Sequence, residues 1–140
     1  MFEWNEKLSV GISEIDEQHK KLLEIGRKFV DVLESTESGY DEYDELRKLL
    51  ANLYNYTEYH FDYEEELMEK AGYADLHSHH IQHEKFKEKI SEIDLDELDE
   101  DQYIYTMEIL DFLSNWIVNH ILKIDTQYKP IVLNYLSKEN

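Results

Sequence analysis

The 140-residue sequence contains no cysteine, and this absence excludes several kinds of chemistry at once. Disulfide bonds, iron–sulfur clusters, thiolate zinc sites and cysteine nucleophiles all require that side chain. Any metal ion bound by this chain must therefore be held by nitrogen and oxygen ligands.

Glycine and proline are also scarce, with four residues of the first and one of the second. An all-β fold needs many tight turns, and these two residues supply most of them. The scarcity therefore favours long helices. The length is typical of one domain, and we expect residues 1–140 to form a single one.

Basic residues are few, since 14 lysines and arginines stand against 33 acidic residues, for a formal net charge of −19. Nucleic acids and anionic membranes bind basic surfaces, so we expect neither as a partner, and the charge favours a monomer. No signal peptide is visible at the N-terminus, and polar residues interrupt the most apolar stretch, residues 109–124. We therefore expect a cytoplasmic protein.

Four segments show the apolar periodicity of amphipathic helices. They span residues 12–33, 46–67, 76–93 and 106–124. Short connections between them make neighbouring helices antiparallel. The pattern therefore predicts an all-α fold, an antiparallel up-down-up-down four-helix bundle.

The ends of these helices are predicted from local residues. An irregular N-terminal arm should precede the first helix, with Ser9 or Ser13 as its cap. Residues 35–39 should break that helix, and Gly72 should end the second. We expect the acidic residues 94–101 to have low helix propensity, and Pro130 to begin or kink a short C-terminal helix.

Histidine occupies positions on the apolar faces where a bundle normally places leucine. His19 lies between Ile15 and Leu22 in the first segment, and His120 continues the apolar face of the fourth. One buried histidine is usually a hydrogen-bonded core residue. Five of them on four inward faces are difficult to explain in that way, because each poorly satisfied group costs on the order of several kcal/mol.

Two pairs with a spacing of four residues complete the pattern. His60 and Glu64 form one pair, and His79 and His83 form the other. Residues four apart on a helix share a face, with Cβ atoms about 6 Å apart. Each pair alone is weak evidence, because surface pairs at this spacing are common. On inward faces together with the other histidines, they predict a metal site.

Other histidines and acids near these positions need separate treatment. His77 and His80 lie on the charged face of the third segment, so we expect them to face solvent and leave them out of the ligand set. Asp125 follows His120 by five residues, about 140° round an α-helix, and reaches the site only through local distortion or from the helix end. Asp111 is an alternative acid, but it lies off the apolar face.

The donor set narrows the choice of metal. Imidazole-rich shells with shared carboxylates suit iron better than calcium or magnesium, which prefer oxygen ligands throughout. Zinc remains chemically possible. The sequence has no H-E-x-x-H motif, which leaves a zinc protease unsupported, and no E-x-x-H motif, which counts against a ferritin-like di-iron carboxylate bundle.

The residues resemble those of the hemerythrins, and specifically of the single-domain bacterial hemerythrins. The resemblance covers nearly the whole chain and extends over all four helical segments. One departure is Ala74, where the family often has proline, and it should loosen the start of the third helix. The matching residues are Trp4, residues 9–12 and 15–20, His60 with Phe61, Glu64 with Glu65, Met68, residues 79–83, Phe86, Trp116, His120 with Ile121, and Asp125.

The resemblance implies a four-helix bundle around a non-haem di-iron centre with an oxo or hydroxo bridge. It also implies that two carboxylates bridge the irons and that the iron with fewer imidazoles keeps an open position. The implied ligands are His79, His83 and His120 for one iron, His19 and His60 for the open one, and Glu64 and Asp125 as the bridges.

The function implied by the resemblance is reversible binding of dioxygen, for storage, delivery or scavenging, rather than enzymatic turnover. Two alternatives share the same site. A sensor of oxygen or redox state usually needs a fused signalling domain, and an oxidase or peroxidase needs an electron supply and a proton donor. Candidates for an apolar oxygen pocket, for which plain core packing is the alternative role, are Phe61, Trp116, Ile117 and Ile121.

Overall fold

The computed structural model describes residues 2–139, which contain helices and connecting segments but no strand. In chain order the elements are η1 (Glu6–Leu8), α1 (Ser13–Glu37), α2 (Tyr43–Ala71), α3 (Leu76–Ser91), α4 (Leu95–Glu100), α5 (Gln102–His120), η2 (Ile121–Asp125) and α6 (Thr126–Glu139).

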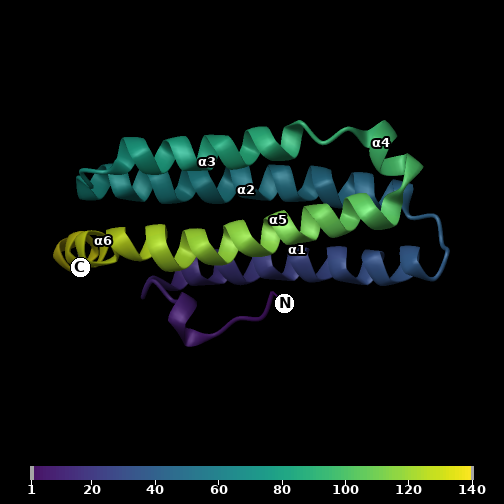
Figure 1. Cartoon of the computed structure of the whole chain (residues 1–140). Coiled ribbons are helices and arrows are strands. Elements are labelled where there is room, and N and C mark those ends of the chain that lie inside the picture. The colour runs from purple at the N-terminus through teal and green to yellow at the C-terminus, as the bar shows by residue number, and fades with distance from the viewer. Residues whose placement is uncertain (1, 140) are drawn as a thin grey trace.

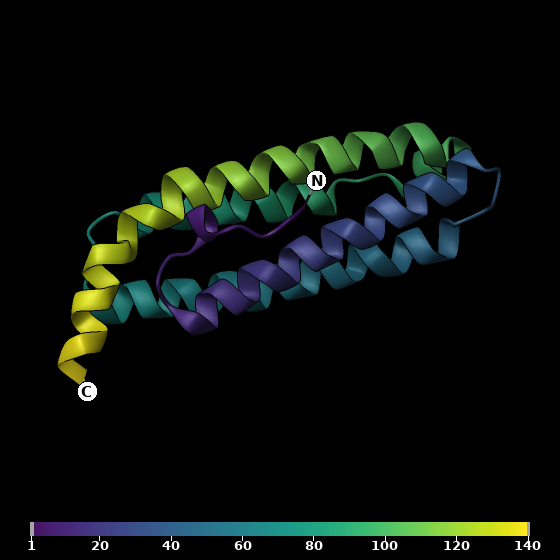
Figure 2. The same ribbon diagram turned by 90° about the horizontal axis from the view of Figure 1, so that it is seen from below.

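The long helices α1, α2, α3 and α5 form an antiparallel bundle (Figure 1). Helix α2 packs against α1 and α3, and α5 packs against α1. The N-terminal arm runs alongside α1 and α5, and α6 turns away from the direction of α5 (Figure 2). The predicted all-α, up-down-up-down bundle is confirmed. Within residues 2–139, no helix has the length and apolar character needed to cross a membrane.

The N-terminus of α1 is held by an acid rather than by the predicted serine cap. Ser13 is the first helical residue, and Ile12 precedes it without a side-chain cap. The Asp16 carboxylate accepts hydrogen bonds from the backbone N–H of Val10, at 2.8 Å, and from the Ser9 hydroxyl, at 2.5 Å. The prediction of Ser9 or Ser13 as the cap was wrong, because Asp16 ties the arm to the helix from inside its first turn.

The other helix boundaries follow the expected pattern with three differences. Gly72 ends α2 as predicted, with a left-handed φ of 73°. Helix α1 continues to Glu37, into the segment expected to break it. Of the two roles predicted for Pro130, beginning the last helix is wrong, because Pro130 lies inside α6, and a kink there stays a prediction. Residues 95–100 form α4, because the Asp94 side chain caps that helix by accepting two backbone N–H groups.

The buried apolar residues form two clusters, and a layer of histidines and carboxylates lies between them. The larger cluster fills the body of the bundle, and the smaller one lies where α2, α6 and the start of α1 meet. On three helical segments, a residue of the polar layer follows a member of one cluster and precedes a member of the other. These triplets are Ile15–His19–Leu22, Phe61–Glu64–Met68 and Ile121–Asp125–Tyr128.

Candidate metal centre

Seven side chains converge in this polar layer, and all of them are buried. Their ligand atoms form two groups, in each of which all atoms lie within 4.8 Å of one another. Glu64 and Asp125 belong to both groups, so the groups share two carboxylates. One group adds His79, His83 and His120 to these carboxylates, and we call it the three-imidazole half. The other group adds His19 and His60, and we call it the two-imidazole half.

The paired ligands come together through ordinary helical spacing. His60 and Glu64 lie one turn apart on α2, with Nε2 and Oε1 separated by 3.1 Å. His79 and His83 lie one turn apart on α3, with ring centroids 4.5 Å apart. Side chains four residues apart on a helix point the same way. The rigid helices therefore present each pair to the bundle interior as a unit.

Asp125 reaches the cluster through a local change in helix geometry. Five residues of α-helix would place it about 140° round the axis from His120. Residues 121–125 instead form η2, a π-helical turn, whose i→i+5 hydrogen bonding brings Asp125 back beneath His120. His120 Nε2 and Asp125 Oδ1 are 3.0 Å apart. The alternative acid Asp111 is exposed and lies near Asn115, outside the cluster.

In the three-imidazole half, ring nitrogens face one another at short distances. His120 Nε2 lies 3.1 Å from Nε2 of His79 and 3.1 Å from Nε2 of His83. The same nitrogen also approaches Asp125. A neutral imidazole nitrogen is either a donor or an acceptor, so one nitrogen cannot satisfy all of these contacts as hydrogen bonds. Converging lone pairs of this kind fit a metal ion between them.

In the two-imidazole half, both carboxylates approach the imidazoles. His19 Nε2 is 3.0 Å from Asp125 Oδ2 and 3.7 Å from Glu64 Oε2. Within the part of the chain that the structure describes, His19 Nε2, Glu64 Oε1 and both Asp125 oxygens are buried without a hydrogen-bond partner. Buried polar atoms without partners are costly. A metal ion would satisfy these atoms together, so the residues present fit the predicted centre.

The outer nitrogens of three imidazoles donate hydrogen bonds to residues that the sequence pattern did not indicate. Such bonds fix the tautomer of each ring and turn the other nitrogen towards a metal. Every one of these partners is adjacent in sequence to a predicted ligand, and that adjacency is the signal that could have identified it. The pairs are His60 with Gln18 at 2.6 Å, His83 with Glu65 at 2.8 Å, and His120 with Gln82 at 3.2 Å.

The two histidines left out of the ligand set differ from each other. His77 is exposed, as predicted. His80 is half-exposed, and its Nδ1 bonds to the Glu65 carboxylate that also accepts from His83. Burial alone would raise the pKa of Glu65, but the two histidines lower it below its ordinary value. His80 is therefore only partly exposed, and Glu65 links it to the three-imidazole half although it belongs to neither donor group.

Tyr128 is a further residue of the site that the sequence pattern did not indicate. Its hydroxyl donates to Glu64 Oε2 at 2.6 Å, and its ring lies 5.8 Å from that of His79. Burial, together with the charges of Glu64 and Asp125, raises the pKa of Tyr128 well above its ordinary value, so it remains a donor. Its position three residues after Asp125 on the same buried face was the available signal.

The protonation of the metal-free cluster is governed by its two carboxylates. Burial lowers the pKa of His19, but Asp125 and Glu64 raise it more, to about 10. Burial raises the pKa of Asp125, but the surrounding histidines hold it well below its ordinary value. The cluster therefore pairs carboxylate anions with at least one protonated imidazole. A metal cation would take the place of that proton.

Aromatic rings cover the three-imidazole half. Phe61 stacks on His83 with centroids 3.8 Å apart and planes 3° apart, and Trp116 stacks on His120 at 4.3 Å and 9°. These two residues were predicted to line an oxygen pocket, and their contacts place them against the three-imidazole half. The other two pocket candidates, Ile117 and Ile121, are buried on either side of His120.

A family model and known proteins match this chain. The model of the hemerythrin HHE cation binding domain matches residues 10–132. A bacteriohemerythrin of Clostridium acetobutylicum is 38% identical over 128 residues, which cover 91% of this chain and 98% of that protein. One from Pseudomonas paraeruginosa is 33% identical over 136 residues, which cover 96% of this chain and 84% of that protein.

Solved structures are similar as well. The crystal structure of a wild-type hemerythrin superposes with a TM-score of 0.75 at 27% sequence identity, covering 93% of this chain and 96% of that one. A crystal structure of a hemerythrin mutant, in which one leucine is replaced by alanine, gives the same TM-score and identity. The similarity in sequence and the similarity in structure therefore both extend over most of the chain.

Proposed function

This chain belongs to the hemerythrin family, and we propose that its seven converging residues hold the two iron ions at which it binds dioxygen reversibly. Oxygen binding at a di-iron centre is the function of this family. When bound, the iron pair supplies two electrons and an exchangeable coordination position. The observation that carries the ligand assignment is the sharing of Glu64 and Asp125 between two groups of buried donors.

The division of the imidazoles assigns a role to each half. The three-imidazole half would provide three nitrogens and one oxygen from each carboxylate, and the oxo or hydroxo bridge would complete the six positions of its ion. The two-imidazole half has one nitrogen fewer, so its ion has room for an exchangeable ligand. We therefore assign dioxygen to the side of His19 and His60. The near-complete burial of both residues supports a site that admits a small apolar molecule.

In this proposal, residues around the ligands hold protons and keep the ligand side chains in one orientation. Gln18 accepts the Nδ1 proton of His60 and so leaves the Nε2 lone pair free for a metal ion beside Glu64. Tyr128 donates its hydroxyl proton to Glu64 and keeps that carboxylate in one orientation. These contacts fix the bridge and one ligand of the open side before any metal binds.

Exclusion of water is the role we assign to the four predicted pocket residues. Phe61 and Trp116 cover imidazoles of the three-imidazole half, and Phe61 also touches His60 on the side assigned to dioxygen. Ile117 and Ile121 place apolar surface before and after His120. Bound oxygen is released unchanged only when water and additional protons stay away from it. A polar residue at Ile121 or Trp116 should therefore shorten the lifetime of the oxygenated protein.

A carrier that stores, delivers or scavenges oxygen is the physiological role that we favour over an enzyme or a sensor. We also propose that residues 1–140 act as one domain and as a monomer, because a net charge of −19 opposes self-association. The cytoplasmic location remains a prediction.

The test is iron analysis and optical spectroscopy of the reduced protein, first in air and then after removal of oxygen. A carrier should contain two irons per chain and should lose its oxygenated spectrum on deoxygenation. Steady oxygen consumption with an added reductant would instead indicate an oxidase. Zinc without an oxygen adduct would overturn the proposal.

A further inference from the structure

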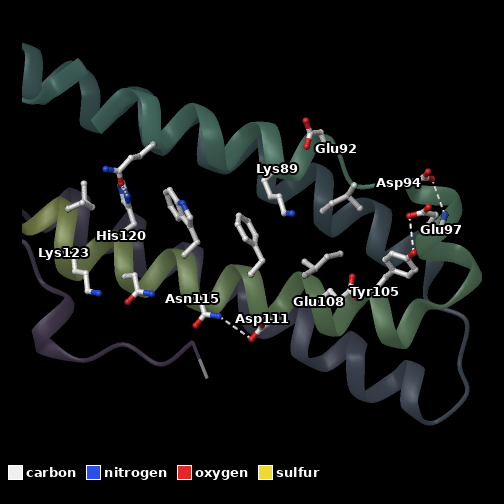
Figure 3. A pocket seen from close by; sticks show the side chains of 17 residues that line it. Lys89, Glu92, Asp94, Glu97, Tyr105, Glu108, Asp111, Asn115, His120 and Lys123 are labelled. Carbon is white, nitrogen blue, oxygen red and sulfur yellow. Dashed lines mark hydrogen bonds between the residues drawn. The ribbon is translucent and has the colours of Figure 1, made fainter. Parts of the chain in front are cut away.

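A groove of about 860 Å³ lies between α3 and α5, beside the metal centre (Figure 3). Helix α3 and the segment that follows it form one wall, and α5 together with η2 forms the other. The inner end of the groove reaches His120, which at 5% is the most exposed of the seven predicted ligands. Small-molecule sites in proteins have volumes of about 300–1,000 Å³, so the groove is large enough for such a ligand.

Aromatic rings form much of the groove wall on α5. Phe112 and Trp116 are half-buried, so part of each ring faces the groove. Behind them, Phe86 contacts both rings, with centroid distances of 5.6 Å and 4.4 Å. The Nζ of Lys89 lies over the ring of Phe112, 5.9 Å from its centroid. The Lys89 ammonium group therefore already makes a cation–π contact with the face of the Phe112 ring.

The charges on the rim favour a cation. Glu97 and Glu108 both lie close enough to raise the pKa of Tyr105, whose hydroxyl donates to Glu97. A second copy of this chain would bring a further charge of −19 and be repelled. In total the groove is lined by the carboxylates of Glu92, Asp94, Glu97, Glu108 and Asp111, against the ammonium groups of Lys89 and Lys123.

We propose that this groove binds a flat, cationic aromatic molecule. Its ring lies against Phe112 and Trp116, and its positive charge lies among the rim carboxylates. Aromatic stacking and cation–π attraction act together on such a ligand, and the carboxylates add long-range attraction. Because Trp116 is stacked on His120, the ligand lies one ring away from the metal centre. Binding of this kind is distinct from oxygen binding and does not depend on iron.

The test is isothermal titration calorimetry of the full chain with three flat probes of different charge. Methyl viologen is a dication, 4,4′-bipyridine is its neutral counterpart, and anthraquinone-2-sulfonate is an anion. Methyl viologen should bind at one site, about tenfold more tightly than bipyridine, and lose affinity as salt screens the rim. Equal affinity for the neutral probe, tighter binding of the anion, or no binding of the dication would overturn the proposal.

Variants separate the groove from the general acidity of the surface. Lys89→Gln removes a competing cation and should strengthen methyl viologen binding by about threefold. The double variant Glu97→Gln/Glu108→Gln should weaken it by about tenfold. The matched control Glu24→Gln/Asp31→Asn removes the same charge from exposed positions of α1 and should change the affinity by less than about twofold.

Two results would show that the rim does not form the site. One is equal weakening by the control pair and the rim pair, which would indicate non-specific attraction to an acidic protein. The other is weaker binding by Lys89→Gln.

Phe112→Leu keeps apolar volume but removes the ring, and it should weaken binding by about fivefold while the circular dichroism spectrum is unchanged.

Discussion

The two halves of the metal centre are built from the same kinds of residues, yet their surroundings differ. In the three-imidazole half, every imidazole lies against an aromatic ring: His83 against Phe61, His120 against Trp116, and His79 against Tyr128. In the two-imidazole half, the two rings meet edge to face, with centroids 4.8 Å apart and planes 72° apart. His60 also touches Phe61 at a tilt, with centroids 5.8 Å apart.

In the proposed function, this difference in surroundings lets one bundle hold one ion tightly and leave the other accessible to a ligand. Stacked rings restrain the three imidazoles and fill the space beside them. The other half receives one imidazole from α1 and one from α2, while the imidazoles of α3 and α5 point to the opposite side. The asymmetry therefore arises because α3 supplies a pair of histidines where α1 supplies a single one.

The largest effect is expected from removing a carboxylate that both halves share. Glu64→Gln should abolish binding of both ions, because Glu64 belongs to both donor groups, whereas His60→Ala should lose mainly the ion of the two-imidazole half. Iron per chain after anaerobic reconstitution measures both outcomes. Glu66→Gln, an exposed neighbour on α2, is the matched control. Retention of two irons by Glu64→Gln would show that the two halves do not depend on Glu64 as a shared ligand.

Removal of an aromatic ring that covers an imidazole should cost more stability than a change of a buried polar residue one turn before His60. Phe61→Ala should lower the free energy of unfolding of the metal-free protein by about 3–5 kcal/mol, because it leaves a cavity against His83. Thr57→Ala, one turn before His60, should cost about 1 kcal/mol, since Thr57 donates one hydrogen bond to a backbone carbonyl. Urea unfolding measures the loss of stability in each variant. Equal losses would contradict the closer packing that we assign to the three-imidazole half.

Tyr128→Phe tests the hydrogen bond that orients the shared carboxylate. The variant keeps the ring on His79 but removes the donor to Glu64, so it should destabilise the protein by about 1.5–3 kcal/mol. Tyr135→Phe, on the same helix, is the control. A change no larger than that of the control would show that Glu64 is held without Tyr128.

The smallest effect concerns protons in the two-imidazole half. The pKa of His19 is raised to about 10 in the metal-free fold, so zinc binding at pH 7.5 should release about one proton from it. The same shift stabilises the metal-free fold fully below pH 6.5, and this contribution disappears as the pH rises through about 10. Calorimetry in buffers of different ionisation enthalpy measures the release. No release at pH 7.5 would contradict the raised pKa.

Much of the fold and the positions of six candidate ligands could be predicted because they depend on helical periodicity. His19, His60 and Glu64 lie on apolar faces, and a face is visible in the sequence. Asp125 could not be placed by that rule, because η2 is a π-helical turn rather than a continuation of α5. Its inclusion came from resemblance to a family.

The contacts between helices were harder to predict. Glu65 and Tyr128 belong to the site because other helices bring His83 and Glu64 against them, and the sequence indicates the two residues only by their positions near the predicted ligands Glu64 and Asp125. The groove between α3 and α5 has the same origin, since it depends on how far two helices stand apart. Helix α4 was missed because the Asp94 cap outweighs the low helix propensity of an acidic segment.

The division of the centre into a closed and an open half is tested most directly by crystallography of the ferric, iron-loaded protein soaked in azide. Anomalous scattering at the iron edge locates the metals, and azide marks the exchangeable position. We predict two irons, with azide on the one bound by His19 and His60. Azide on the iron bound by His79, His83 and His120, or a single iron in the cluster, would contradict this account.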